Sequence, residues 1–140
     1  MPQTDTIIRT SRVFKHSPER IFSAFADPAR LARWWGPAGF TNSFHVFEFK
    51  PGGPWVFTMH GPNGTDYPNE CVFREIEPNR IVIEHTGEPH FLLELAFNAK
   101  DGGTELTWSQ QFDSPEVAER VRPICEPANE QNLDRLAAVL

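Results

Sequence analysis

Cysteine, basic residues and long apolar runs are all scarce in this chain. Only Cys71 and Cys125 occur among 140 residues, whereas small secreted domains usually carry dense disulfide frameworks. We therefore expect two reduced thiols in packed positions, with a single disulfide between them as the alternative. No run approaches the ~18 apolar residues of a membrane helix, and no charged region followed by an apolar stretch lies near the N-terminus. These absences predict a cytoplasmic protein without membrane insertion.

The charge balance excludes a second class of function. Acidic side chains number 19 against 13 basic ones, and the formal charge is −6. This charge disfavours phosphate-tracking nucleic-acid binding and adhesion to anionic membranes. With 39% hydrophobic residues, 12 phenylalanines and 4 tryptophans, the chain is not disordered. We expect one domain over residues 1–140, large enough to bury a core.

From residue 40 onward, apolar residues alternate with polar ones in segments that each end at a turn signal. The turn signals lie at residues 51–54, 61–64, 78–79, 87–89 and 101–103. They predict an antiparallel meander of six strands, and the apolar segment Thr6–Phe14 predicts a seventh. Two apolar pairs compete for the core within residues 40–49, which favours a β-bulge or a helix that covers the second face.

Three helices are predicted from capping signals. Ser17 and Asp27 each precede a proline and then apolar residues at helical spacing. Ser114 begins the third helix in the same way. Pro123 and Pro127 should interrupt it, because proline removes a donor and clashes with the preceding turn. We expect a short helix to about residue 122 and a final helix over about 127–140, with a buried stripe of Leu133, Leu136, Ala137 and Leu140.

Two adjacent tryptophans, Trp34 and Trp35, stand beside glycines and a proline. Both rings cannot point into one core, so one should pack inward while the other lines a rim or groove.

The residues that carry a family resemblance span nearly the whole chain. They are Asp27–Leu31, Trp34–Pro37, Gly39–Thr41, Pro51–Gly53, Trp55, His60–Pro62, Tyr67, Glu75–Ile76, Arg80–Val82 and Asn129–Leu136. With these motifs the sequence resembles the START and polyketide-cyclase (SRPBCC) superfamily, and within it the branch named for the activator of heat-shock-protein-90 ATPase homologue. The resemblance implies an α+β helix-grip fold. In this fold a seven-stranded curved antiparallel sheet carries two short helices after its first strand, and a C-terminal helix packs across its concave face.

The resemblance also implies an apolar cavity between sheet and helix. Our first hypothesis is that this cavity holds a small hydrophobic molecule (a lipid, a polyketide or an aromatic compound) without a cofactor. Gln110 departs from the apolar residues common in similar chains. Its amide needs a partner, because an unsatisfied buried polar group costs ~1–3 kcal/mol. The residues that we expect to line the cavity are Trp35, Phe40, Phe47, Trp55, Phe57, Phe91, Leu93, Trp108, Gln110 and Leu133.

A second hypothesis is a cyclase- or hydrolase-type enzyme. Glu70 could pair with His60 or His85 as an acid and a base, because desolvation raises a carboxylic pKa and a close imidazolium lowers it. No nucleophile motif accompanies these residues. The simpler alternative is that Glu70 and His60 hydrogen-bond backbone at a hairpin end.

Metal binding and protein association are weaker hypotheses. Three imidazoles and a thiolate could form a tetrahedral zinc set from His60, His85, His90 and Cys71. No compact ligand spacing supports that set, so we expect no metal. A third hypothesis, implied by the resemblance, is a stress-related module that interacts with a chaperone. Homodimerisation is compatible with the sequence, which does not decide it.

Overall fold

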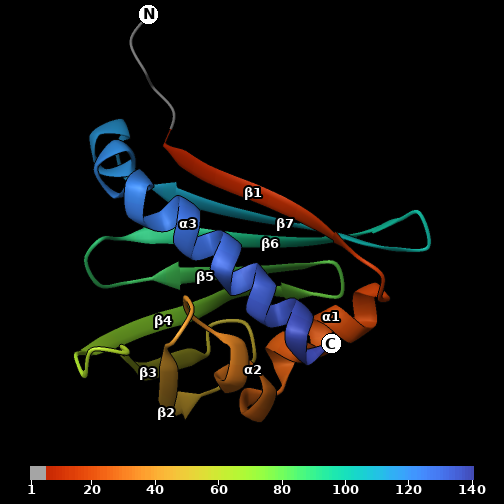
Figure 1. Cartoon of the computed structure of the whole chain (residues 1–140), viewed down its shortest axis with the longest axis horizontal. Coiled ribbons are helices and arrows are strands. Elements are labelled where there is room, and N and C mark those ends of the chain that lie inside the picture. Colours follow the sequence, from red (N-terminus) through yellow and green to blue (C-terminus); the bar gives the residue numbers. More distant parts are fainter. Residues whose placement is uncertain (1–5) are drawn as a thin grey trace, which may run out of the picture.

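The computed structural model describes residues 6–140 and has the helix-grip arrangement (Figure 1). In this part of the chain one seven-stranded antiparallel sheet has the order β1-β7-β6-β5-β4-β3-β2. Its strands are β1 (Ile7–Phe14), β2 (Thr41–Phe47), β3 (Pro54–His60), β4 (Asp66–Glu77), β5 (Arg80–His85), β6 (Phe91–Lys100) and β7 (Gly103–Phe112). The helices are α1 (Pro18–Ala26), α2 (Pro28–Trp34) and α3 (Pro115–Val139). Figure 1 shows α3 running diagonally across one face of the sheet.

The predicted meander is confirmed, since each predicted turn joins two hydrogen-bonded neighbours between β2 and β7. The alternation on β6 and β7 is confirmed too: Leu95 pairs with Trp108, and both are buried. Of the two explanations predicted for residues 40–49, the β-bulge is present and lies between Phe44 and Val46. It turns Phe44 and Phe47 to the same side, where their rings stack with centroids 5.7 Å apart, and it leaves Val46 exposed.

The first two helices begin where their capping signals predict. The Ser17 hydroxyl accepts a hydrogen bond from the backbone N–H of Arg20 at 3.2 Å, and the Asp27 carboxylate accepts one from Ala29 at 3.0 Å. Each cap satisfies one of the backbone donors that a helix start leaves without an intrahelical partner.

The predicted break in the last helix is wrong, because α3 continues through both prolines. Pro123 and Pro127 lie one helical turn apart and are exposed. The carbonyl groups that lose a donor there face solvent, where water can take the place of the missing N–H. Figure 1 shows that the axis of α3 changes direction after its first turns, so the prolines bend the helix without ending it.

The core forms two clusters, one under each end of α3. Leu133 and Leu136 join a large cluster with α1, α2 and the central strands. Ala118, near the other end, packs with Ile8 and Phe112 in a small second cluster. The predicted buried stripe of α3 is wrong at Ala137, which is exposed. Its neighbour Leu136 faces the sheet, and the next residue along a helix points in a different direction, here toward solvent. Along residues 6–140 no helix combines the length and the apolar composition that crossing a bilayer requires.

Candidate functional site: a cavity beneath the C-terminal helix

A cavity of about 780 Å³ lies between the sheet and the middle of α3. In sequence, the helix residues that line it fall between Ala118 and Leu133, the buried residues at the two packed ends of α3, and Val121 and Cys125 among them also pack against the smaller cluster. Tyr67 and Ile124 also line the cavity and are exposed, which opens it to solvent between the start of β4 and α3. The aromatic residues of its wall are Trp35, Phe40, Phe57, Tyr67, Phe91, Trp108 and Phe112.

Most of the residues predicted to line the cavity do so. Trp35, Phe40, Phe57, Phe91, Leu93, Trp108 and Gln110 are on its wall. The remaining predicted residues, Phe47, Trp55 and Leu133, lie in or against the large core cluster and are not on the cavity wall. Trp55 is enclosed by aromatic rings, among them Phe47, and Leu133 lies where α3 rests on the sheet. Periodicity assigned Trp55 and Leu133 to the correct faces of their strand and helix, but it does not say where along those faces the packing ends.

The tryptophan pair divides as its sequence predicts. Trp34 is fully buried and its indole N–H donates to the carbonyl of Ala24 at 3.1 Å. Trp35 is half-buried on the cavity wall, where its ring stacks on that of Trp108. The ring centroids are 5.6 Å apart and the ring planes are inclined by 28°. The Trp108 indole N–H is buried and has no acceptor within residues 6–140.

Arg135 fastens the segment after α2 to the last helix. Its guanidinium donates to the carbonyl groups of Arg33, Trp35, Gly36, Pro37 and Phe40 at 2.9–3.1 Å. Partial burial lowers the pKa of this guanidinium, but arginine remains charged. The contacts hold Trp35 and Phe40 at the rim of the cavity.

Two amide side chains of α3 complete this attachment. Asn132 accepts from the Gly36 N–H and donates to the Trp34 carbonyl, both at 3.1 Å, and Gln131 accepts from the Ala38 N–H at 3.1 Å. Gly36 has φ of 100°, and a Cβ there would lie 2.7 Å from the Met59 methyl group. The Met59 methyl group could move aside, but the positive φ would strain any residue with a Cβ, so glycine is favoured here.

On its other flank, α3 is tied to β1. Arg12 forms ion pairs with Asp134 at 2.6 Å and Glu130 at 3.0 Å, and the Thr10 hydroxyl donates to Glu130 in a very short hydrogen bond. The helix above the cavity is thus held from both sides.

Gln110 has the partner that its burial requires. Asn129 on α3 donates to the Gln110 amide oxygen at 2.8 Å, and the two side chains are each 7% exposed on the cavity wall. Asn129 and Asn132 were missed as cavity residues. The available signal was two amides three residues apart on the face of the helix that also carries Leu133 and Leu136.

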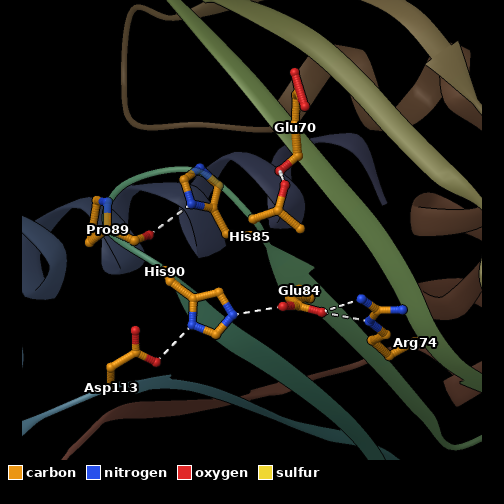
Figure 2. Close-up of polar contacts among 8 residues, drawn as sticks. Glu70, Arg74, Glu84, His85, Pro89, His90 and Asp113 are labelled. Carbon is orange, nitrogen blue, oxygen red and sulfur yellow. Dashed lines mark hydrogen bonds and ion pairs between the residues drawn. The ribbon is translucent and has the colours of Figure 1, made fainter.

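Glu70 is not part of an acid/base pair. Its neighbours on β4, Asn69 and Cys71, face inward, so the Glu70 side chain faces the outer side of the sheet, as does Val56, its partner on β3. Figure 2 shows its carboxylate directed away from His85, and its backbone carbonyl accepts hydrogen bonds from the Thr86 N–H and hydroxyl at 3.0 Å. The contact here is made by the Glu70 backbone, and the alternative of a hydrogen bond from its side chain to backbone is not seen among the contacts of residues 6–140.

His85 faces the cavity, but both of its ring nitrogens are engaged. Nδ1 hydrogen-bonds to the Pro89 carbonyl at 2.8 Å and Nε2 to the Asn69 amide oxygen at 2.9 Å. The ring stacks on Phe91 with centroids 4.8 Å apart. These contacts fix the wall where the 86–90 turn meets β4.

His60 does not bond to backbone as the alternative expected. Its Nε2 lies 2.7 Å from the Ser43 hydroxyl and its Nδ1 lies 2.7 Å from an Asp66 carboxylate oxygen. These residues alternate with the inward-facing Phe44, Met59 and Tyr67, so the hydroxyl–imidazole–carboxylate row lies on the outer face of the sheet.

The remaining candidates for a metal site do not converge. Cys71 and Cys125 are both free thiols on the cavity wall, as expected of reduced cysteines. Burial raises the pKa of Cys71 to about 12 and also raises the pKa of Cys125, which keeps both protonated near neutral pH. Within residues 6–140, no three His, Cys, Asp or Glu side chains gather as metal ligands would.

A charged network supports the turn beside the cavity mouth (Figure 2). His90 bonds to Glu84 and to Asp113, both at 2.7 Å, and Arg74 donates to Glu84 at 2.6 Å. Hydrogen bonds that His90 donates to Glu84 and Asp113 raise the pKa of His90 above 6.5, and hydrogen bonds that Glu84 accepts from His90 and Arg74 lower the pKa of Glu84 below 4.5.

We expect this network to stabilise the fold most between pH 4.5 and 6.5. The contribution of His90 is complete below its unfolded pKa of 6.5 and is lost as the pH rises through the higher folded value. The contribution of Glu84 is complete above 4.5 and is lost as the pH falls through its lower folded value. The difference in melting temperature between wild type and His90→Gln should therefore shrink as the pH is raised above 6.5.

Circular dichroism melts over this pH range measure the difference. His16→Gln serves as the control, because the His16 side chain has no hydrogen bond within residues 6–140. A difference between wild type and His90→Gln that stays constant with pH would contradict the assignment.

Comparison with known proteins agrees with the observed fold. Among solved structures, a protein from Arthrobacter aurescens is 22% identical with a TM-score of 0.88, and the alignment covers 98% of this chain and 90% of that one. A protein from Rhodobacter sphaeroides is 25% identical with a TM-score of 0.84 and coverage of 97% and 95%. The AHSA1 protein from Silicibacter pomeroyi is 22% identical with a TM-score of 0.75 and coverage of 94% and 95%.

No protein of curated function is significantly similar in sequence. Residues 15–140 do match one sequence family, which is described as Activator of Hsp90 ATPase homolog 1-like protein. The match covers the two short helices, the meander and α3. The chain therefore belongs to the Activator of Hsp90 ATPase homolog 1-like protein family.

Proposed function

We propose that this protein binds one small hydrophobic molecule in the cavity between the sheet and α3. The observation that carries the proposal is the cavity itself, about 780 Å³ in volume, with a mostly apolar wall that includes seven aromatic side chains. Sites for small organic ligands typically have this size and this mixture of an apolar wall with a few polar groups. Each Å² of apolar ligand surface removed from water contributes ~25 cal/mol, which gives useful affinity without bond making.

Titration with the uncharged probe N-phenylnaphthylamine tests the proposal. We expect saturation at one probe per chain, with a rise in probe fluorescence. Trp35→Ala should weaken binding by about 10-fold, because it removes apolar surface that the probe would cover. Full burial of a large apolar side chain contributes ~1.5–3 kcal/mol to the free energy. Binding that is absent, or equally tight in the variant, would count against the cavity as the site.

A second candidate function is ester hydrolysis on the outer face of the sheet. The row Ser43–His60–Asp66, with both contacts at 2.7 Å, favours it. In this order of groups an imidazole accepts the hydroxyl proton while a carboxylate orients the ring. Ser43 Oγ would attack the ester carbonyl and give its proton to His60. The leaving alcohol would take that proton, and water would release the acid and restore Ser43. The row is solvent-exposed and lies on the face opposite the cavity wall, so we rank this function below ligand binding.

Fluorophosphonate labelling and p-nitrophenyl acetate hydrolysis test the second candidate. Labelling should occur at Ser43 and disappear in Ser43→Ala, together with the hydrolysis. Ser11→Ala is the matched control, since Ser11 is an exposed strand serine with no side-chain hydrogen bond in the described part of the chain. An unlabelled wild-type protein, or equal hydrolysis by both variants, would remove this function.

A further inference from the structure

The inner wall of the cavity carries polar groups but no charged pair. Of the acidic residues that border it, Asp66 bonds to His60 on the outer face, Glu70 points outward, and Glu88 is on the exposed turn. No lysine or arginine is among the lining residues of the described chain. The one imidazole on the wall, His85, has both ring nitrogens engaged, Nδ1 with the Pro89 carbonyl and Nε2 with the Asn69 side-chain amide, so neither nitrogen is available to a ligand ion.

A charged ligand group would find no counter-ion on such a wall. Burying an unpaired carboxylate or ammonium costs several kcal/mol, whereas an uncharged polar group needs only a hydrogen-bond partner. The wall therefore discriminates against both anions and cations.

The Gln110–Asn129 pair offers the partners that an uncharged group needs. Its internal hydrogen bond uses the Gln110 oxygen and one Asn129 N–H. The Gln110 amide N–H groups and the Asn129 oxygen have no other partner within residues 6–140. Exchanging oxygen and nitrogen in both amides still leaves one donor and one acceptor. The pair is thus complementary to a group that both accepts and donates a hydrogen bond.

Aromatic rings flank this pair. Trp108 precedes Gln110 by two residues on β7, so both side chains lie on the same face, and the Trp35 ring stacks on Trp108. Phe91 on β6 is paired with Phe112, at the other end of the same wall. Aromatic faces favour offset stacking with a flat ring system.

We propose that the ligand is an uncharged, flat aromatic molecule whose hydroxyl or carboxamide binds the Gln110–Asn129 pair. This inference rests on the proposed binding function and specifies its ligand class. Lipids with an ionised head group, such as fatty-acid anions, are excluded by it.

Calorimetric titration with four naphthalenes near neutral pH tests the inference. The compounds are naphthalene, 2-naphthol, 2-naphthoate and 2-naphthylmethylammonium, which share one ring system and differ in their polar group. We expect 2-naphthol to bind at least about 10-fold more tightly than either ion. It should bind about 3- to 10-fold more tightly than naphthalene, the equivalent of one net hydrogen bond.

The neighbouring glutamines of β7 give a matched pair of variants. Gln110→Leu should remove the preference for 2-naphthol over naphthalene, and Gln111→Leu, at an exposed position on the opposite face, should keep it. The double variant Gln110→Leu/Asn129→Leu removes both partners together, so that no buried amide is left unpaired, and it should behave like Gln110→Leu.

The outcomes separate the two claims. If naphthalene binds but an ion binds as tightly as 2-naphthol, or if the preference for 2-naphthol survives in both Gln110 variants, the inference is overturned and the proposed function stands. If none of the four compounds binds, the proposed function falls and the inference with it.

Discussion

Replacing both Cys125 and Ala128 with tryptophan is expected to abolish binding of apolar probes. The two residues lie three positions apart on α3, and both line the cavity. Two indoles on that face of the helix would occupy the space beside Gln110 and Asn129 where we place the ligand. We expect the affinity for N-phenylnaphthylamine to fall by more than about 30-fold, because the apolar surface that the probe would cover is already covered.

The same helix provides a control for this change. Ala137 and Ala138 are exposed on α3, so Ala137→Trp/Ala138→Trp adds the same two side chains outside the cavity. Probe titration and circular dichroism of both double variants distinguish blocking from unfolding. Equal affinity in the two variants, with both folded, would show that the probe binds elsewhere.

Arg135→Ala is expected to have the largest effect on stability. The variant removes the donor shared by five carbonyl groups of residues 33–40, of which those of Trp35 and Pro37 keep a second donor. Hydrogen bonds from a charged donor contribute ~1.5–3 kcal/mol each, and here they share one partly exposed side chain. We expect a loss of about 3 kcal/mol in the free energy of unfolding, which for a chain of this size lowers the melting temperature by roughly 10 °C.

Two further arginine variants make this test specific. Arg122→Ala removes exposed ion pairs with Glu119 and Glu126 on the same helix and should cost under about 1 kcal/mol. Arg135→Lys keeps the charge but loses the planar fork, so it should fall between alanine and wild type. If thermal melts gave Arg135→Ala and Arg122→Ala the same melting temperature, Arg135 would not have the proposed role of attaching residues 33–40 to α3.

Strand alternation and turn signals sufficed to predict the sheet. The pairing of Leu95 with Trp108 and the bulge at Phe44 follow from side-chain period and turn position, which are local properties of the sequence. The caps at Ser17 and Asp27 are local in the same sense. Where the prediction failed, at Pro123 and Pro127, the outcome depended on which side of α3 faces solvent. That side is decided by tertiary packing.

The site was predictable only in part, because its polar contacts join distant segments. Periodicity placed Trp35 and Gln110 on the cavity wall, but it could not pair Gln110 with Asn129. The contacts of Arg135 reach carbonyl groups about a hundred positions away and depend on backbone that turns at Gly36. His60 was selected as a candidate base, yet its neighbours Ser43 and Asp66 become visible only when β2, β3 and β4 are aligned.

Native mass spectrometry of the folded protein titrated with 2-naphthol tests most directly whether the space beneath α3 takes up one uncharged aromatic molecule. We predict an adduct that saturates at one molecule per wild-type chain and is absent from the Cys125→Trp/Ala128→Trp variant. No adduct on the wild type, or adducts of equal intensity on both proteins, would contradict it.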